Sequence, residues 1–180
     1  SPVLAPFNNT SGRMIFPFTP TIFLSQRANY NTIDLTHSNY PFYAYQNSQI
    51  DDITITGTFA VENDDDAKYW VAVLHFLRTM TKMFYGESNP LGNPPLLTRL
   101  SGYGEYVLNK IPVLITNFSV DLAEDVDYRQ IDIEGNINYV PLLSTIVVTC
   151  TPNYARRSHA KFDLTKFANG GFVDKPEGFV

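Results

Sequence analysis

The strongest constraint on the fold is a change of hydrophobic period between residues 50 and 85. Residues 50–61 read as a strand in which every second residue from Ile53 to Val61 falls on one face and threonine or alanine falls on the other, which is the period of a half-buried β-strand. Asn63 and the three aspartates after it are typical of a helix N-terminus, where side-chain oxygens cap free N–H groups and negative charge suits the helix dipole. The sequence therefore predicts a strand that leads directly into a helix of about residues 64–85.

The predicted helix carries apolar side chains on more than one face. One stripe at helical spacing forms the candidate helix core: Trp70, Val73, Leu74, Leu77 and Phe84. A second stripe includes Phe76 and Met80, while Arg78 and Lys82 favour the C-terminal end and Gly86 is a natural stop. A helix that is apolar on two sides must cover the sheet and also contact something else, which in a single-layer domain is a neighbouring subunit.

The rest of the chain reads as short strands separated by turns. The expected strands lie at 21–25, at 40–45 on a sheet edge, in a hairpin over 96–108, and at 113–122, 128–140 and 142–151, with 29–39 as a polar turn region and a bulge at Gly135. This pattern predicts a mainly β fold, an antiparallel β-barrel or sandwich with one long flanking α-helix. We expect a single domain over 1–180, with an N-terminal arm at 1–14, a β core at 15–152 and a C-terminal arm at 153–180.

The amino-acid composition and net charge favour some classes of protein and argue against others. Charged residues make up 17% of the chain, below the usual quarter, and aromatic residues make up 14%. A surface rich in tyrosine and poor in lysine is typical of protein interfaces, although an aromatic β core would also consume these residues. The net charge of −5 argues against a protein that grips a nucleic-acid backbone. We expect no membrane insertion and no signal peptide, because no apolar run is long enough and the start lacks a basic segment.

Few residues suggest chemistry. The lone cysteine, Cys150, lies in an apolar run and reads as a small buried hydrophobe. The three histidines are far apart, no paired Cys or His motif with metal spacing is present, and nucleophile and phosphate-loop motifs are missing. An acidic turn containing Glu124, Asp125 and Asp127 suits a solvated or interface surface better than a calcium site or an acid–base pair. We expect a chain that is not an enzyme, with no catalytic residue, no cofactor and no metal.

Charge is segregated along the chain. Residues 121–134 contain six acids and one arginine, whereas the tail from 153 contains five lysines and arginines against three acids. These segments either pair between subunits or form two solvated surfaces that never meet. The candidate assembly residues are Arg156, Arg157, Lys161, Phe162, Leu164 and Phe167 in the tail, and Asp121, Glu124, Asp125 and Asp127 in the acidic segment.

Several segments occur in a characteristic order. They are 16–23, 28–30, 34–40, 44–50, 73–86, 94–97, 102–104, 111–115, 118–120 and 124–128. In this order the chain resembles the tail-tube initiator proteins of contractile-tailed phage baseplates, over about residues 15–152. The resemblance implies a tail-tube fold whose copies form a ring, expected to be hexameric, that templates tube assembly on the baseplate hub and lines the channel for viral genome ejection.

The resemblance also implies partners and a location. The partners would be further copies of this chain, other tail-tube and baseplate hub proteins, and the sheath as a further candidate, with DNA only passing through the lumen. The protein would be a structural virion protein of the tail or baseplate, assembled in the host cytoplasm. Two alternatives remain: a monomeric β-sandwich that binds a ligand such as a carbohydrate through exposed aromatic rings, and a hydrolase using the acidic turn.

Overall fold

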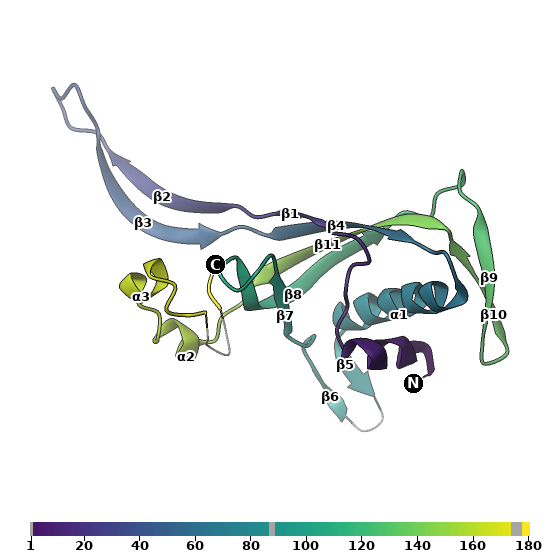
Figure 1. The fold of residues 1–180 in the computed structure, drawn as a ribbon. Coiled ribbons are helices and arrows are strands. Elements are labelled where there is room, and N and C mark those ends of the chain that lie inside the picture. The colour runs from purple at the N-terminus through teal and green to yellow at the C-terminus, as the bar shows by residue number, and fades with distance from the viewer. Residues whose placement is uncertain (1, 87–88, 174–177) are drawn as a thin grey trace.

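The computed structural model describes residues 2–86, 89–173 and 178–180, and it confirms a mainly β fold with a flanking helix. At its centre lies an antiparallel sheet of five strands in the order β1-β4-β11-β8-β7, curled into a half barrel with one helix across one face (Figure 1). These elements are β1 (Thr21–Phe23), β4 (Ile53–Ala60), α1 (Asp64–Met80), β7 (Thr98–Gly102), β8 (Leu108–Val120) and β11 (Leu143–Pro152).

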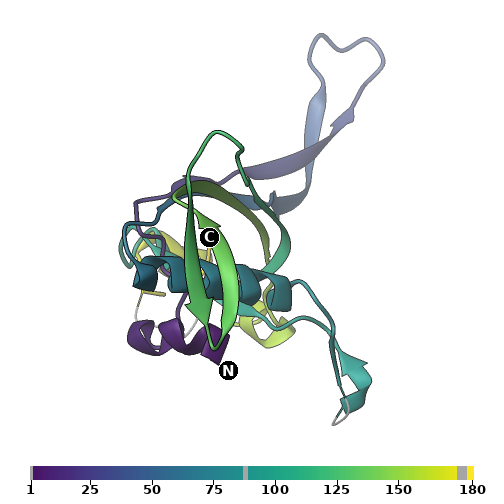
Figure 2. The same cartoon turned by 90° about the vertical axis from the view of Figure 1, so that its right-hand side faces the viewer.

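Three two-stranded hairpins extend this centre. They are β2 (Gln26–Ile33) with β3 (Phe42–Ile50), β5 (Phe84–Gly86) with β6 (Asn89–Asn93), and β9 (Tyr128–Ile133) with β10 (Asn136–Pro141). Figure 1 shows β2–β3 projecting from one end of the molecule and β9–β10 standing at the other. Figure 2, seen from the β9–β10 end, shows that the β2–β3 hairpin lies far behind and leads away from the sheet.

The core lies between the half barrel and α1. Alternate residues of the sheet face inward and are buried: Ile53, Ile55, Phe59, Ile111, Val113, Ile146, Val148 and Cys150. From the helix, Trp70, Val73 and Leu77 meet them, as the predicted stripe requires. The indole Nε1 of Trp70 donates a hydrogen bond of 2.8 Å to the buried hydroxyl of Ser144, which satisfies both polar groups inside the core.

The end of the predicted helix is wrong. α1 ends at Met80, and Thr81 closes it by donating its backbone N–H and its hydroxyl to the carbonyl of Leu77. Phe84 therefore leaves the helical stripe, lies in β5 and is 54% exposed. Leu74 is half-buried against the core, so four of the five candidate core residues are placed as predicted.

The predicted N-terminal arm is also wrong, because it is folded onto its own chain. Residues Pro2–Thr10 form a 3-10 helix, η1, that packs on α1. Phe7 is buried with its ring edge-to-face against Tyr69 and Phe76, at 5.6 Å from each. The Tyr69 hydroxyl donates to the Ile15 carbonyl and accepts from the Ile15 N–H, at 2.7 Å each. The second apolar side of α1 is thus covered within the protomer at these positions.

Three of the predictions for the hairpins need correction. The segment 29–39 was expected to be a turn, but β2 continues through it as far as Ile33. The prediction failed because a hairpin that is exposed on both faces shows no hydrophobic alternation. The expected short strand at 40–45 is part of the nine-residue β3. The expected single strand 128–140 is a hairpin, since Glu134 and Gly135 both have positive φ, as a tight two-residue turn requires.

The C-terminal arm is folded as well. It contains two short helices, α2 (Arg156–His159) and α3 (Leu164–Ala168), which lie beside the β7–β8 end of the sheet (Figure 1). The side-chain amide of Asn109 donates to the Val173 carbonyl, and Gly178 is buried where a Cβ would collide with the Asn109 carbonyl oxygen. Within the residues that the structure describes, no helix is both long and apolar enough to cross a membrane.

Candidate assembly surfaces

The β2–β3 hairpin forms the first surface, called the hairpin surface (residues 26–50). It continues the β1–β4 pair outward and is tied at its base by the Ser25–Asp51 backbone hydrogen bond of 3.0 Å and by an Arg27–Asp51 ion pair of 3.1 Å. Its large exposed side chains are Tyr30, Ile33, Leu35, Tyr40, Phe42, Tyr43 and Tyr45.

Both faces of this hairpin carry apolar groups. Tyr30 lies directly opposite Tyr45, with ring centroids 5.7 Å apart in an edge-to-face arrangement, while Ile33 lies opposite Phe42. An isolated two-stranded hairpin is only marginally stable in water. A surface of this kind is therefore typical of a segment that another chain covers.

The outward face of the half barrel forms the second surface, called the threonine face. It contains Thr54, Thr56 and Thr58 of β4, and their registered neighbours on the next two strands include Thr145, Thr149, Asn117 and Ser119. These side chains are polar but uncharged, and the apolar side chains of Val147 and Phe23 lie beside them, opposite Thr56 and Thr54. The predicted alternation is confirmed from Ile53 to Val61, whose inward set is buried, but the predicted strand start at 50 is wrong, because Ile50 ends β3 and β4 begins at Ile53.

The loop between β8 and β9 forms the third surface, called the acidic turn (residues 121–127). Asp121, Glu124, Asp125 and Asp127 are all exposed, and so is Leu122, at 59%. The candidate acidic residues thus share one turn at the β9–β10 end of the molecule.

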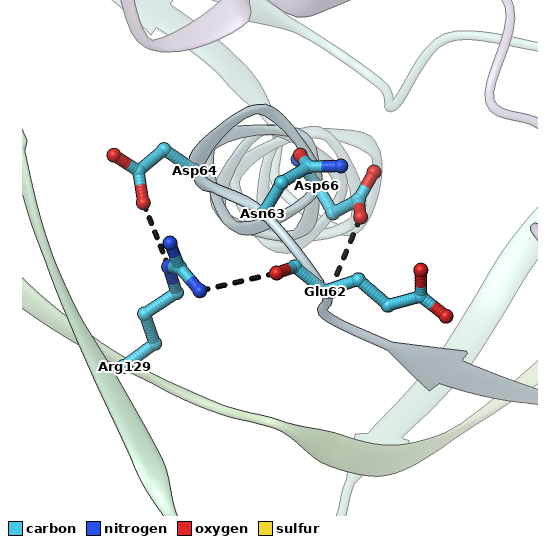
Figure 3. A network of polar contacts seen from close by, with 5 residues as sticks. All are labelled: Glu62, Asn63, Asp64, Asp66 and Arg129. Carbon is cyan, nitrogen blue, oxygen red and sulfur yellow. Dashed lines mark hydrogen bonds and ion pairs between the residues drawn. The ribbon is translucent and has the colours of Figure 1, made fainter.

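Arg129, two residues after the acidic turn, contacts the start of α1. Arg129 places its Nε 2.7 Å from an Asp64 carboxylate oxygen, and its Nη1 donates to the Glu62 carbonyl at 3.1 Å (Figure 3). The start of α1 is also closed by Asn63, whose side-chain oxygen accepts the Asp66 N–H at 2.8 Å. These contacts explain the aspartate run as a helix N-terminus, and they direct the guanidinium away from the acidic turn.

The C-terminal module forms the fourth surface, called the aromatic groove, with a volume of about 740 Å³. The rings of Phe162, Phe172 and Phe179 pack on one another with centroids 5.0 to 6.1 Å apart. The charged residues among the described lining of the groove are Arg157, Lys161, Lys166 and Asp163. The combination is a cationic rim around an apolar floor.

The predicted tail residues do not all belong to this groove. Arg157, Lys161 and Phe162 line it, whereas Arg156 lies outside its lining, Phe167 lines a neighbouring pocket with Tyr106, and Leu164 is 71% exposed on α3. Phe172 and Phe179 were missed, because isolated aromatic residues in a glycine-containing tail give no periodic signal. The groove and the acidic turn lie at opposite ends of the molecule (Figures 1 and 2), so the two candidate sets do not meet within one protomer.

The structure offers little local chemistry in the residues it describes. Among them, no group of three or more His, Cys, Asp or Glu side chains is placed to hold a metal ion. Burial, with a smaller effect from the Asp52 carboxylate, raises the pKa of the Cys150 thiol to about 11. The thiol therefore stays protonated at neutral pH and fills space in the core.

No protein-family model matches the chain, and no curated protein sequence matches it.

Proposed function

We propose that this chain is a structural protein that forms a homo-oligomeric ring of a phage tail tube or baseplate hub, templates tube assembly and lines the channel for DNA. The observation that carries the proposal is the exposed area of the protomer. The chain exposes 12449 Å², whereas a compact monomer of 20.3 kDa exposes about 8,800 Å².

The size of this excess matches a permanent assembly. About 3,600 Å² of additional surface falls within the roughly 2,000–5,000 Å² that obligate interfaces bury. The hairpins that project from the sheet (Figure 1) carry exposed aromatic side chains, among them Tyr30, Tyr43 and Tyr139. Ring neighbours, or rings stacked above and below, would cover these segments.

The charge of the surfaces supports a channel. DNA that must pass through a lumen should meet few cations, because each phosphate–cation contact adds affinity. The threonine face carries no charged side chain at these registered positions, where hydroxyl and amide groups lie beside Val147 and Phe23, and the net charge of the chain is negative. We assign this face to the lumen or to a subunit seam, and we assign no catalytic role to any residue.

Truncation of the hairpin surface tests the proposal. Residues 27–49 would be replaced by Asn-Gly, which closes a two-residue turn between β1 and β4 without altering their register. We expect the truncated chain to fold but to remain monomeric by light scattering at concentrations where the full chain forms rings. The matched control replaces only Ser38, in the hairpin loop, with alanine.

The outcomes separate the candidate functions. If the truncated chain assembles as the full chain does, the hairpin surface is not an interface. If the full chain is itself strictly monomeric at high concentration, the ring is wrong and a monomeric ligand-binding module, such as one for carbohydrate, becomes the better reading.

A further inference from the structure

We propose that the aromatic groove of one protomer binds the acidic turn of a second copy, so that neighbours in the ring join head to tail. This inference rests on the proposed function and names the contact that would close the ring. It concerns two surfaces that have complementary chemistry and that one protomer cannot bring together.

Charge complementarity is the first argument. Among the described residues that line the groove, Arg157, Lys161 and Lys166 are cationic and Asp163 is the acidic one, and Asp163 uses a carboxylate oxygen to cap the Lys166 N–H at 3.0 Å. The acidic turn presents four exposed carboxylates, and the guanidinium of Arg129 is held at the start of α1. Each surface therefore has an excess of the charge that the other lacks.

An apolar match is the second argument. Leu122 stands exposed in the acidic turn, directly after Asp121 and two residues before Glu124. The apolar part of the groove is the packed cluster of Phe162, Phe172 and Phe179, an aromatic surface on which an aliphatic side chain can pack. Exposed ion pairs set register and orientation more than affinity, so the leucine on the aromatic floor would supply most of the binding.

Geometry is the third argument. The helices α2 and α3, which carry groove residues, and the β8–β9 connection that forms the turn lie at opposite ends of the central sheet (Figure 1), so their contact uses two different surfaces on every copy. Such a contact is heterologous, and repeated heterologous contacts produce either a closed ring or an open filament. A closed ring leaves neither surface uncovered in any copy.

A competing cationic surface provides a control. The exposed side chains of His75, Arg78 and Lys82 line a pocket near the end of α1, next to Met83. Met83, Phe84 and Tyr85 also line this pocket, each more than half exposed, whereas the three phenylalanine rings of the groove pack on one another. We therefore assign the acidic turn to the groove, and the experiment below compares the two surfaces directly.

Charge reversal in two complementary variants tests the contact. The groove variant carries Lys161→Glu with Lys166→Glu, and the turn variant carries Glu124→Lys with Asp125→Lys. Each variant alone would place like charges opposite each other, so we expect the concentration needed for assembly to rise by about tenfold or more. An equimolar mixture should assemble again, because every groove then finds a turn of opposite charge.

The mixture excludes misfolding as an explanation, because unfolded variants would not regain assembly together. The control variant, Arg78→Glu with Lys82→Glu, makes the same change of net charge and should assemble as the wild type does. If the control loses assembly while the groove variant keeps it, the acidic turn binds α1 and this inference is overturned. Two variants that each lose assembly and do not recover as a mixture would also overturn it.

The same measurement separates this inference from the proposed function. If the groove and turn variants both form normal rings, the head-to-tail contact is wrong and the ring remains. If the mixture assembles only into open chains of variable length, the contact stands and the closed ring is wrong. Particle images and masses of the mixtures distinguish these results.

Discussion

Leu77→Ala should remove about 2–5 kcal/mol from the free energy of unfolding. Leu77 is 0% exposed and lies on the stripe of α1 that meets the half barrel. The substitution deletes three carbon atoms, and at about 0.8 kcal/mol each their transfer accounts for roughly 2.4 kcal/mol. The cavity adds to this loss, since other side chains of the same core, such as Ile111 and Ile146, are themselves fully buried and leave little room for relaxation.

Chemical denaturation followed by circular dichroism would measure the loss, at protein concentrations too low for association to stabilise the fold. The matched control is Leu164→Ala, the same chemical change at a side chain that is 71% exposed, and it should shift stability by less than about 0.5 kcal/mol. A loss below about 1 kcal/mol at Leu77 would mean that α1 does not pack on the sheet in this register, and the reasoning would be refuted.

Three further predictions address the surfaces and the core. Tyr30→Ser with Tyr45→Ser should change unfolding by no more than about 1.5 kcal/mol, the value of an aromatic pair, yet should weaken assembly measured by light scattering; unchanged assembly would contradict it. A cysteine placed at Thr56 should react with a thiol reagent in the free protomer and more slowly in the ring, and equal rates would remove the threonine face from lumen and seam. Because the pKa of Cys150 is raised in the folded state, its contribution to the free energy of unfolding should be complete below pH 9.0 and should fall between pH 9.0 and about 11. Cys150→Ala should flatten that part of the plot of unfolding free energy against pH, and a plot identical to that of the wild type would contradict this cause.

The sequence predicted those elements whose signal is local. β4 alternates because one face is buried, and the start of α1 is marked by the Asn63 cap, so both were placed closely. The end of α1 was misplaced because Gly86 is a general stop signal. In the structure, Thr81 closes the helix a turn and a half earlier, and Phe84 is needed in β5 instead of the core.

Elements without a repeating pattern were missed for a physical reason. The hairpin surface is exposed on both faces, so polar and apolar residues follow no period there, and residues 29–33 were mistaken for a turn. Phe7 gave no hint of its docking, because a single aromatic residue between prolines and asparagines has no periodic neighbours. The phenylalanines of the aromatic groove come together only through the folding of the tail.

The candidate assembly residues were only partly predictable. Segregation of charge is visible in the sequence, and the structure gathers the four acidic candidates in one exposed turn. Their position at the opposite end from the groove depends on the order of strands in the sheet, which the sequence pattern alone does not determine. That separation keeps the two surfaces apart within one protomer, which is why we propose that they meet between copies.

The most direct test of the proposed ring is the mass and shape of the purified chain in solution. Negative-stain images combined with native mass measurement at rising protein concentration would give both quantities. The proposal predicts closed rings or stacked tubes with a central channel, whose mass is a whole multiple of 20.3 kDa. Particles of 20.3 kDa at every concentration would contradict it.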